Sequence, residues 1–269
     1  MLSLPTNIIT AFREYIREQK KKLFGEVGST TYIVREDRTA EGIDGRAIVH
    51  LDPKSHIAEQ YRIMRTNLRS LSPDKPLKSF VLTSALRGEG KTITSCNIAL
   101  AFSQEPDIKV LLVDADLRKP NIHKIFGLSR EPGLADALVN TVTLEQLIAQ
   151  PRIGGLCIIT AGTSMPNPSE ILSSQSLKDL IARLKQRFDY LFFDCAPIVP
   201  VTDAGVLGSQ VDGAILIVRA ASTGALDVER AFSLLSDANA KPVGAVLTNV
   251  VTYIPYYLYR YRYIYVNKY

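Results

Sequence analysis

The segment from residue 79 to residue 100, "SFVLTSALRGEGKTITSCNIAL", most constrains how this chain can fold. It opens with an apolar run typical of a buried strand and closes with a pattern typical of a helix. Between them, Gly88 and Gly90 permit a tight loop whose backbone N–H groups converge on an anion, and the helix N-terminus adds a favourable dipole. The segment therefore predicts a phosphate-binding loop between a strand and a helix.

The spacing of this loop is that of a P-loop. Ala85, Gly90, Lys91 and Thr92 occupy the fixed positions of the motif, with alanine in place of its first glycine. We expect Lys91 to reach the β- and γ-phosphates of ATP, and the Thr92 hydroxyl to contact Mg²⁺. The residues expected to contact the nucleotide here are Arg87, Gly88, Glu89, Gly90, Lys91, Thr92 and Ile93.

Two later apolar runs end in carboxylates. "VLLVDAD" ends with Asp114 and Asp116, and "YLFFD" ends with Asp194. Open α/β sheets place ligand chemistry at the carboxyl ends of their strands, where neighbouring carboxylates repel one another unless a cation or a proton intervenes. An apolar strand that ends in aspartate is also the Walker B pattern, which helps to hold Mg²⁺. With the P-loop, these carboxylates predict a site for ATP and Mg²⁺.

Strands and helices alternate along most of the chain. The expected strands are "SFVLTS", "VLLVDAD", "GLCIITAG", "YLFFDCAP", "GAILIVRA" and "VGAVLTNV". Helical patterns such as "TITSCNIALAFSQ", "LKDLIARLKQRF" and "ALDVERAFSLLSDA" separate them. Continuous apolar strands that alternate with helices indicate a parallel sheet covered on both faces. The predicted fold is therefore α/β, of the P-loop NTPase type, with a mostly parallel sheet.

The chain is expected to have three parts. These are residues 1–54, residues 55–252 and residues 253–269. In the first part, Ile8, Phe12 and Ile16 predict a basic amphipathic helix within residues 1–25. That helix either faces a membrane or an activator, or packs on the protein itself. Residues 26–54 have weak periodicity and are interpreted as a linker.

Composition narrows the class of protein. The net charge is +5, and Arg260, Arg262 and Lys268 contribute three of those units within the last seventeen residues, so a broad nucleic-acid surface is not indicated. The three cysteines are far apart, which argues against a disulfide framework or a zinc site and for a reducing cytosol. No apolar run approaches the ~18 residues of a membrane span, and the N-terminus lacks the pattern of a signal peptide. We therefore expect a cytoplasmic protein without a nucleic-acid partner.

The P-loop and the strands that end in "DADLR" and "DCAP" together resemble the bacterial tyrosine kinases, or BY-kinases, associated with polysaccharide export. The resemblance covers about residues 55–269 and includes "EQYRIMR", "NPSEIL", "PVTDAG" and the terminal tyrosines. It implies an ATP site built from the Walker A, Walker A′ and Walker B motifs. The residues implied are Lys91 and Thr92, Asp114 and Asp116, and Asp194. By the same resemblance, Asn249 in "VLTNV" is expected to contact the adenine.

Phosphoryl transfer to tyrosine needs positioning, charge neutralisation and a group that accepts the phenol proton. Asp116 is the candidate base, and Thr92, Asp114 and Asp194 are the candidate metal ligands. Both carboxylates of "DAD" can reach either place, so the two roles stay open. Arg118 is expected either to pair with phosphate or to stabilise the aspartates. The expected catalytic residues are Lys91, Asp114, Asp116 and Asp194.

Glu59, Arg62 and Arg65 are spaced three apart and share one face of the helix expected from residue 55. Taken alone, they indicate a solvated face with salt bridges. Their full match to the ExxRxxR motif of BY-kinases instead implies a ring-like homo-oligomer, in which one subunit's tail reaches the neighbour's ATP site. The resemblance also implies a transmembrane activator or polysaccharide chain-length regulator, a cognate protein-tyrosine phosphatase, and a place at the inner face of the bacterial membrane.

The last seventeen residues, "YIPYYLYRYRYIYVNKY", hold eight of the twelve tyrosines. Their alternation suits a terminal strand, and their aromatic and basic composition suits adhesion to a membrane or a nucleic acid. The resemblance implies instead the acceptor segment of an autokinase that regulates exopolysaccharide or capsule synthesis. The implied phosphoacceptors are Tyr253, Tyr256, Tyr257, Tyr259, Tyr261, Tyr263, Tyr265 and Tyr269.

A partition- or division-site ATPase, acting as a nucleotide-switched scaffold, is the competing prediction. Many such proteins carry a lysine at the second position of the P-loop, where this chain has Leu86. An iron–sulfur role, as in nitrogenase-type iron proteins, is disfavoured because no two cysteines are placed as paired cluster ligands. Leu86 and the tyrosine tail therefore favour the kinase.

Overall fold

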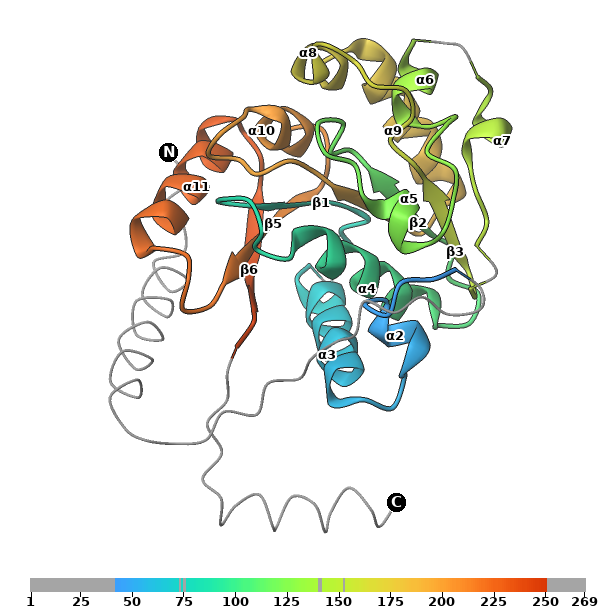
Figure 1. Ribbon diagram of the computed structural model, residues 1–269. Coiled ribbons are helices and arrows are strands. Elements are labelled where there is room, and N and C mark those ends of the chain that lie inside the picture. The colour runs from blue at the N-terminus through green and yellow to red at the C-terminus, as the bar shows by residue number, and fades with distance from the viewer. Residues whose placement is uncertain (1–41, 73, 75, 140–141, 152, 251–269) are drawn as a thin grey trace, which may run out of the picture.

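The computed structural model describes residues 42–72, 74, 76–139, 142–151 and 153–250 (Figure 1). In it, six strands pair in parallel in the order β3-β2-β4-β1-β5-β6. The strands are β1 (Ser79–Ser84), β2 (Val110–Asp114), β3 (Leu156–Ile159), β4 (Tyr190–Asp194), β5 (Gly213–Arg219) and β6 (Pro242–Thr248). Each lies within a predicted strand or overlaps one, so the prediction of a parallel α/β sheet is confirmed. The helix predicted within residues 1–25 and the tyrosine tail lie outside the described residues.

The helices match the stronger helical patterns of the sequence. They are α2 (Ile48–Leu51), α3 (His56–Ser70), α4 (Lys91–Ser103), α5 (Ile122–Ile125), α6 (Leu134–Leu138), α7 (Leu144–Leu147), α8 (Pro168–Leu172), α9 (Gln175–Arg187), α10 (Asp203–Gly208) and α11 (Ala225–Asp237). The start of α3 is fixed by Ser55, whose hydroxyl accepts a hydrogen bond from the Ala58 N–H at 3.1 Å. Within the described ranges, no helix combines the length and the apolar character that crossing a bilayer requires.

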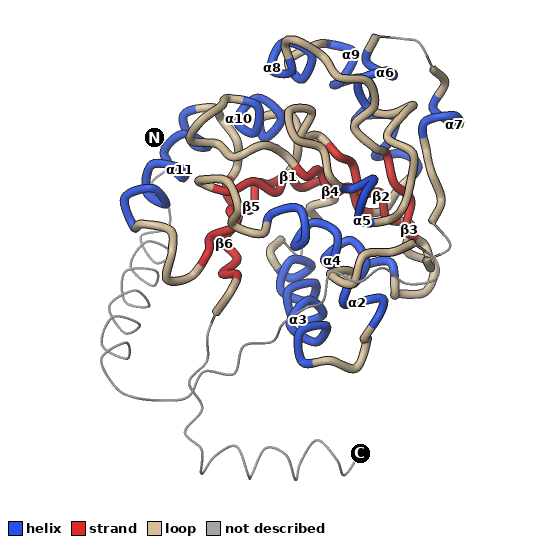
Figure 2. The backbone as a smooth tube through the Cα atoms, in the orientation of Figure 1, coloured by secondary structure: helices blue, strands red, loops and turns tan. Residues whose placement is uncertain are grey.

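The helices form two layers, one on each face of the sheet (Figure 2). α2 to α5 pack on one face, and α6 to α11 pack on the other. Alternate strand residues supply the two layers: Phe80 and Leu82 join the core under α4, and Val81 joins the core of the opposite layer. All three are fully buried, which is why the strands read as continuous apolar runs instead of alternating ones.

Residues 43–51, assigned from the sequence to a linker, belong to the layer that covers α4. Ala47 and Val49 are fully buried there. The Asn97 side chain on α4, also fully buried, accepts a hydrogen bond from the Val49 N–H at 3.0 Å and donates one to the Arg46 carbonyl oxygen at 2.8 Å. The apolar residues of this segment, among them the buried Ile43, Ala47 and Val49, make only a weak periodic signal over so short a length, so this packing could not be predicted from the pattern.

Replacing the fully buried Asn97 tests this attachment. Asn97→Ala is expected to lower the free energy of unfolding by about 2–4 kcal/mol, because it removes two buried hydrogen bonds, one from the Val49 N–H and one to the Arg46 carbonyl. Urea unfolding measures the change. The control is Gln175→Ala at an exposed position, where the change is expected to stay within about 0.5 kcal/mol. Equal midpoints for the two variants would contradict the structural role of residues 43–51.

Candidate active site

The phosphate loop joins the end of β1 to the start of α4. Gly88 and Gly90 have φ angles of +81° and +89°, a left-handed conformation that glycine adopts without strain. Arg87 and Gly88 are exposed at the tip of the loop. Because Gly90 is the N-cap of α4, no side chain caps the first-turn amides. These amide groups and the helix dipole suit the binding of an anion.

Glu89, predicted to contact the nucleotide, turns its side chain into the protein. It is 3% exposed, and its carboxylate accepts hydrogen bonds from the Leu86 N–H at 2.8 Å and from the Thr223 hydroxyl. Its backbone carbonyl accepts another from the Thr248 hydroxyl at 2.7 Å. The Thr248 side chain also lies against Gly90. The Glu89 carboxylate therefore shapes the loop, which is braced by residues that follow β5 and end β6.

Lys91 lies between two carboxylates from different motifs. Its Nζ is 2.7 Å from Asp116 Oδ2 and 3.6 Å from Asp194 Oδ2. Asp194 also accepts hydrogen bonds from the Thr92 hydroxyl at 2.6 Å and from the Ser95 hydroxyl at 3.1 Å. Burial opposes the ammonium charge of Lys91, but Asp194 and Asp116 outweigh it and raise the pKa of Lys91 above its ordinary value. The structure thus brings residues of the three predicted motifs together.

Asp114 lies directly beside Asp194. β2 and β4 are neighbours in the sheet, and the two aspartates are partners in its register. Asp114 Oδ2 accepts hydrogen bonds from the N–H groups of Asn121 and Ile122, each at 3.0 Å. Burial and the charge of Asp194 raise the pKa of Asp114 to about 7, and burial raises the pKa of Asp194 too. Two buried carboxylates side by side favour a nearby cation.

The residues present fit a divalent cation. Asp114 Oδ1 is buried and has no hydrogen-bond partner among the described residues. In the same part of the chain, no three His, Cys, Asp or Glu side chains converge as a metal cage. Mg²⁺ in nucleotide sites is held by one or two carboxylates, by waters and by substrate phosphates. Thr92, Asp114 and Asp194 remain the residues predicted to hold it.

Asp116 and Arg118 lie in the loop that follows β2, because the strand ends at Asp114. Asp116 Oδ1 accepts a hydrogen bond from the Lys119 N–H at 3.0 Å. Arg118 pairs with Asp203, which is fully buried. Arg118 Nε is 2.8 Å from Asp203 Oδ2, and Arg118 Nη2 is 3.0 Å from Asp203 Oδ1. The partner of Arg118 in the structure is thus a residue to which the sequence assigned no role.

Comparison with known proteins decides the family. A family model described as an AAA domain matches residues 81–226. The tyrosine-protein kinase YwqD of Bacillus subtilis (strain 168) is 38% identical over 200 residues, which cover 74% of this chain and 84% of that protein. The chain belongs to the bacterial tyrosine-kinase family. The kinase domain of the Escherichia coli tyrosine kinase ETK is similar in structure, with a TM-score of 0.75 and 28% identity, over 89% of this chain and 98% of that one.

The BY-kinase resemblance is thereby confirmed, and so is the P-loop NTPase fold. The cell division ATPase MinD of Pyrococcus furiosus matches with a TM-score of 0.55 and 23% identity, over 63% of this chain and 71% of that one. Identity this low shows a shared fold alone. The competing prediction of a division-site ATPase is therefore not favoured.

The ExxRxxR motif of this BY-kinase lies on α3, but its two arginines differ in surroundings. Arg62 pairs with Glu59 at 2.9 Å on an exposed face. Arg65 is 17% exposed; its Nη1 donates to the Ala101 carbonyl oxygen at 2.5 Å, and its Nε lies 3.1 Å from Glu105 Oε1. Arg65 therefore ties α3 to the end of α4 within one subunit. Glu59 and Arg62 remain the more accessible part of the predicted interface.

Asn249, predicted to contact the adenine of ATP in this kinase, is exposed and directly follows β6 with φ of +54°. The preceding residue, Thr248, is hydrogen-bonded to the phosphate loop. The structure therefore places Asn249 next to a residue that touches the loop, and its contact with adenine stays a prediction.

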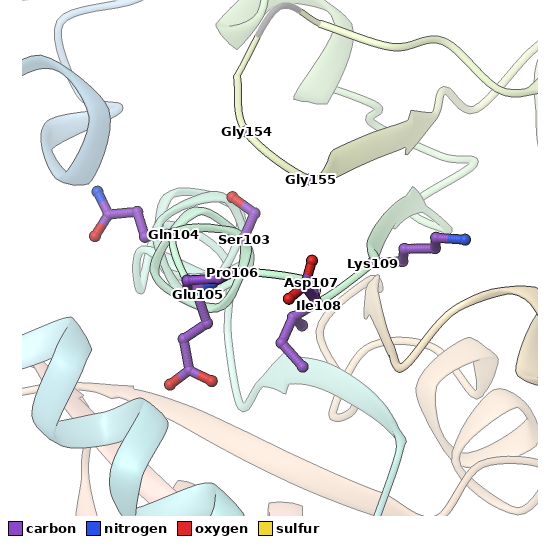
Figure 3. A pocket seen from close by; sticks show the side chains of 9 residues that line it. All are labelled: Ser103, Gln104, Glu105, Pro106, Asp107, Ile108, Lys109, Gly154 and Gly155. Atoms are coloured by element: carbon purple, nitrogen blue, oxygen red, sulfur yellow. The ribbon is translucent and has the colours of Figure 1, made fainter.

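An open groove of about 590 Å³ lies at the opposite edge of the kinase sheet (Figure 3). It is lined by residues 103–109, which precede β2, and by Gly154 and Gly155, which precede β3. Its Glu105 is paired with Arg69 at 2.5 Å. Ligands of open α/β sheets bind at the carboxyl ends of the strands, whereas this groove lies at the amino ends. The kinase site is therefore expected at the carboxyl ends of the strands, where the P-loop lies.

Four residues around the kinase site were missed by sequence reasoning. These are Ser95, Ser169, Asp203 and Thr223. Ser95 lies one helical turn beyond Lys91, so its position was a usable signal. Ser169 and Asp203 lie in "NPSEIL" and "PVTDAG", which supported the resemblance but carried no assigned chemistry. Thr223 has no local signal, because its contact with the loop depends on strand order.

Removing one buried charge tests the acidic pair. Asp114→Asn keeps an oxygen for the two amide N–H groups but relieves the repulsion with Asp194. We expect the Tm of the nucleotide-free kinase to rise by about 3–8 °C, and the affinity for Mg²⁺-ATP to fall at least ~10-fold. Scanning fluorimetry with and without Mg²⁺-ATP measures both. Asp116→Asn is the matched control and is not expected to raise the Tm, because Asp116 is paired with Lys91. Unchanged Mg²⁺-ATP affinity in Asp114→Asn would remove Asp114 from the metal site.

Proposed function

We propose that this chain is an ATP-dependent protein-tyrosine autokinase that phosphorylates its own C-terminal tyrosines. The observation that carries the proposal is the cluster at the carboxyl ends of β1, β2 and β4, where Lys91, Thr92, Asp116 and Asp194 contact one another. The kinases to which the chain is similar support the reaction class. The acceptor tyrosines, Tyr253 to Tyr269, follow β6 in the sequence.

In the proposed reaction, the phenol oxygen of a tail tyrosine attacks the γ-phosphorus of ATP. The bond from that phosphorus to the bridging oxygen breaks, and its electron pair leaves with ADP. Lys91 and the loop amides neutralise charge on the β- and γ-phosphates. Asp116 accepts the phenol proton, which requires Lys91 to leave Asp116 for the phosphates. When bound, Mg²⁺ supplies further positive charge to the same oxygens.

The charge of the tail supports a role as substrate. Arg260, Arg262 and Lys268 give the segment +3, and it holds no Asp or Glu. Each phosphate adds about −1.5 to −2, so two phosphates cancel this charge and more reverse it. A basic tail is attracted to an acidic site, whereas a phosphorylated tail is repelled. Successive phosphorylation would therefore release the product.

The wider setting of the proposal follows from the family. We place the kinase in a ring-like homo-oligomer, with the tail of one subunit serving as substrate of the next, and at the inner face of the bacterial membrane. A transmembrane activator or polysaccharide chain-length regulator would stimulate it, and a protein-tyrosine phosphatase would reverse it. Its output would be the control of exopolysaccharide or capsule synthesis and export.

Incubation with labelled Mg²⁺-ATP tests the reaction. Wild type is expected to form phosphotyrosine, and Lys91→Met to form at least ~100-fold less, because the ammonium group neutralises transferring charge. Deletion of residues 253–269 is expected to abolish phosphotyrosine and to spare ATP binding. A phosphotyrosine blot and a nucleotide-binding assay measure the two effects.

A mixture of variants serves as the control for transfer between subunits. Full-length Lys91→Met, which keeps the tail, is mixed with the tail-less active kinase, and phosphotyrosine is expected on the Lys91→Met chain. Persistent phosphotyrosine in the tail-less protein alone would identify another acceptor. Nucleotide-driven assembly without phosphotyrosine in wild type would instead support the scaffold ATPase.

The two arginines of α3 give separable predictions. Arg62→Glu is expected to weaken the oligomer and slow autophosphorylation, and to cost about 0.5–1.5 kcal/mol of unfolding free energy through loss of the Glu59 pair and the bond to the Pro53 carbonyl. Arg65→Glu is expected to cost about 1–3 kcal/mol, because it loses the Ala101 carbonyl bond and faces Glu105. Light scattering and urea unfolding measure the two quantities. An unchanged oligomer in Arg62→Glu would rule out this face as the interface.

A further inference from the structure

The Arg118 guanidinium joins three segments that meet at the carboxyl edge of the sheet. It belongs to the loop after β2, and its partner Asp203 begins α10, which follows β4. Ser169 on α8, in the segment after β3, completes the cluster. The Ser169 hydroxyl donates to Asp203 Oδ1 at 2.5 Å and accepts from Arg118 Nη2 at 3.0 Å. Both carboxylate oxygens of Asp203 are thus occupied.

The pairing is a rigid one. Two parallel N–H donors of Arg118 meet the two oxygens of Asp203, a fork geometry that lysine cannot reproduce. Asp203 is fully buried, and the Arg118 side chain is 33% exposed. A buried carboxylate with a bidentate partner strongly resists separation, because separation leaves an uncompensated buried charge. The loop after β2 is therefore anchored at Arg118.

Asp116, two residues before this anchor, needs such support during the reaction. In the structure its Oδ2 is held by Lys91 and its Oδ1 by the Lys119 N–H. When Lys91 turns to the phosphates of ATP, Asp116 loses the stronger of these contacts. The Arg118 anchor then remains, because its hydrogen-bond partners are Asp203 and Ser169 and do not include Lys91.

We propose that Asp203 and Ser169 are positioning residues, which act through Arg118 to keep the Asp116 carboxylate in place for the acceptor tyrosine after Lys91 has moved to ATP. This inference rests on the proposed function and gives a role to Asp203 and Ser169, which had none. Loss of the anchor is expected to lower the maximal rate but not the affinity for ATP, because the anchor lies on the Asp116 loop and not on the phosphate loop.

The test measures phosphotyrosine formation by the full-length chain across a range of Mg²⁺-ATP concentrations. Asp203→Asn and Arg118→Met are each expected to lower the maximal rate about 10- to 100-fold, with the half-saturating ATP concentration within about 2-fold of wild type. Ser169→Ala is expected to lower the maximal rate by a smaller factor, and Ser169→Thr, which keeps the hydroxyl, to restore it. If Ser169 had only a structural role, the maximal rate would not depend in this way on the presence of its hydroxyl.

The double variant Arg118→Met with Asp203→Asn isolates the route of action. If Asp203 acts through Arg118, the double variant is no slower than Arg118→Met alone. Its Tm is expected to lie closer to wild type than that of Arg118→Met, since Arg118→Met leaves the buried Asp203 carboxylate without its cation. Where Asp203→Asn fails to fold, the Ser169 pair and the double variant carry the test. Multiplicative loss of rate in the double variant would overturn the inference.

The outcomes distinguish the inference from the function on which it rests. Asp116→Asn that keeps full transfer excludes Asp116 as the base and overturns the inference with it. A wild type without phosphotyrosine overturns both. An active wild type, an inactive Asp116→Asn and an Asp203→Asn variant with undiminished maximal rate would overturn the inference alone. A rise in half-saturating ATP without loss of maximal rate would do the same.

Discussion

The repulsion between Asp114 and Asp194 is the constraint on which the site depends. Parallel pairing of β2 and β4 places the two carboxylates side by side, at 0% and 1% exposure. Asp116 adds a third carboxylate, and Lys91 contributes one ammonium group against the three. A pKa of about 7 at Asp114 shows how the protein absorbs part of this excess. A bound cation would therefore relieve the repulsion that the strand register builds in.

The same constraint gives Lys91 two competing places. It is 2.7 Å from Asp116 in the structure, and the proposed phosphoryl transfer needs it at the phosphates. The exchange requires a phosphate loop that does not collapse when the lysine moves. Glu89, held by Thr223 and by the Leu86 N–H, supplies that rigidity from inside the loop. A carboxylate in an anion-binding loop is tolerated because its hydrogen-bond capacity is taken up by the protein.

The residues that end each strand could be predicted from the sequence, but which strands lie next to each other in the sheet could not. Apolar runs that end in Asp114 and Asp194 locate each carboxylate on its own strand. That the two meet depends on β2 lying next to β4, although β3 comes between them along the chain. The contacts of Asp203 with Arg118 and of Thr223 with Glu89 likewise join segments 85 and 134 residues apart. Periodicity and local motifs report on the element that contains a residue, and such contacts depend on how elements assemble.

The ExxRxxR motif has a role in folding within the subunit, beside its proposed role in assembly. Arg65, with Glu105 and the Ala101 carbonyl, fastens α3 to α4, and α4 begins with Lys91. Arg62, one turn earlier, is 26% exposed and bonds to Glu59 and the Pro53 carbonyl. A subunit contact made through Arg62 would thus press on a helix that is bonded to the nucleotide-binding helix. In the proposed oligomer, Arg65 would connect the Arg62 face to the C-terminal end of α4, and the N-terminal end of the same helix carries Lys91 of the phosphate loop.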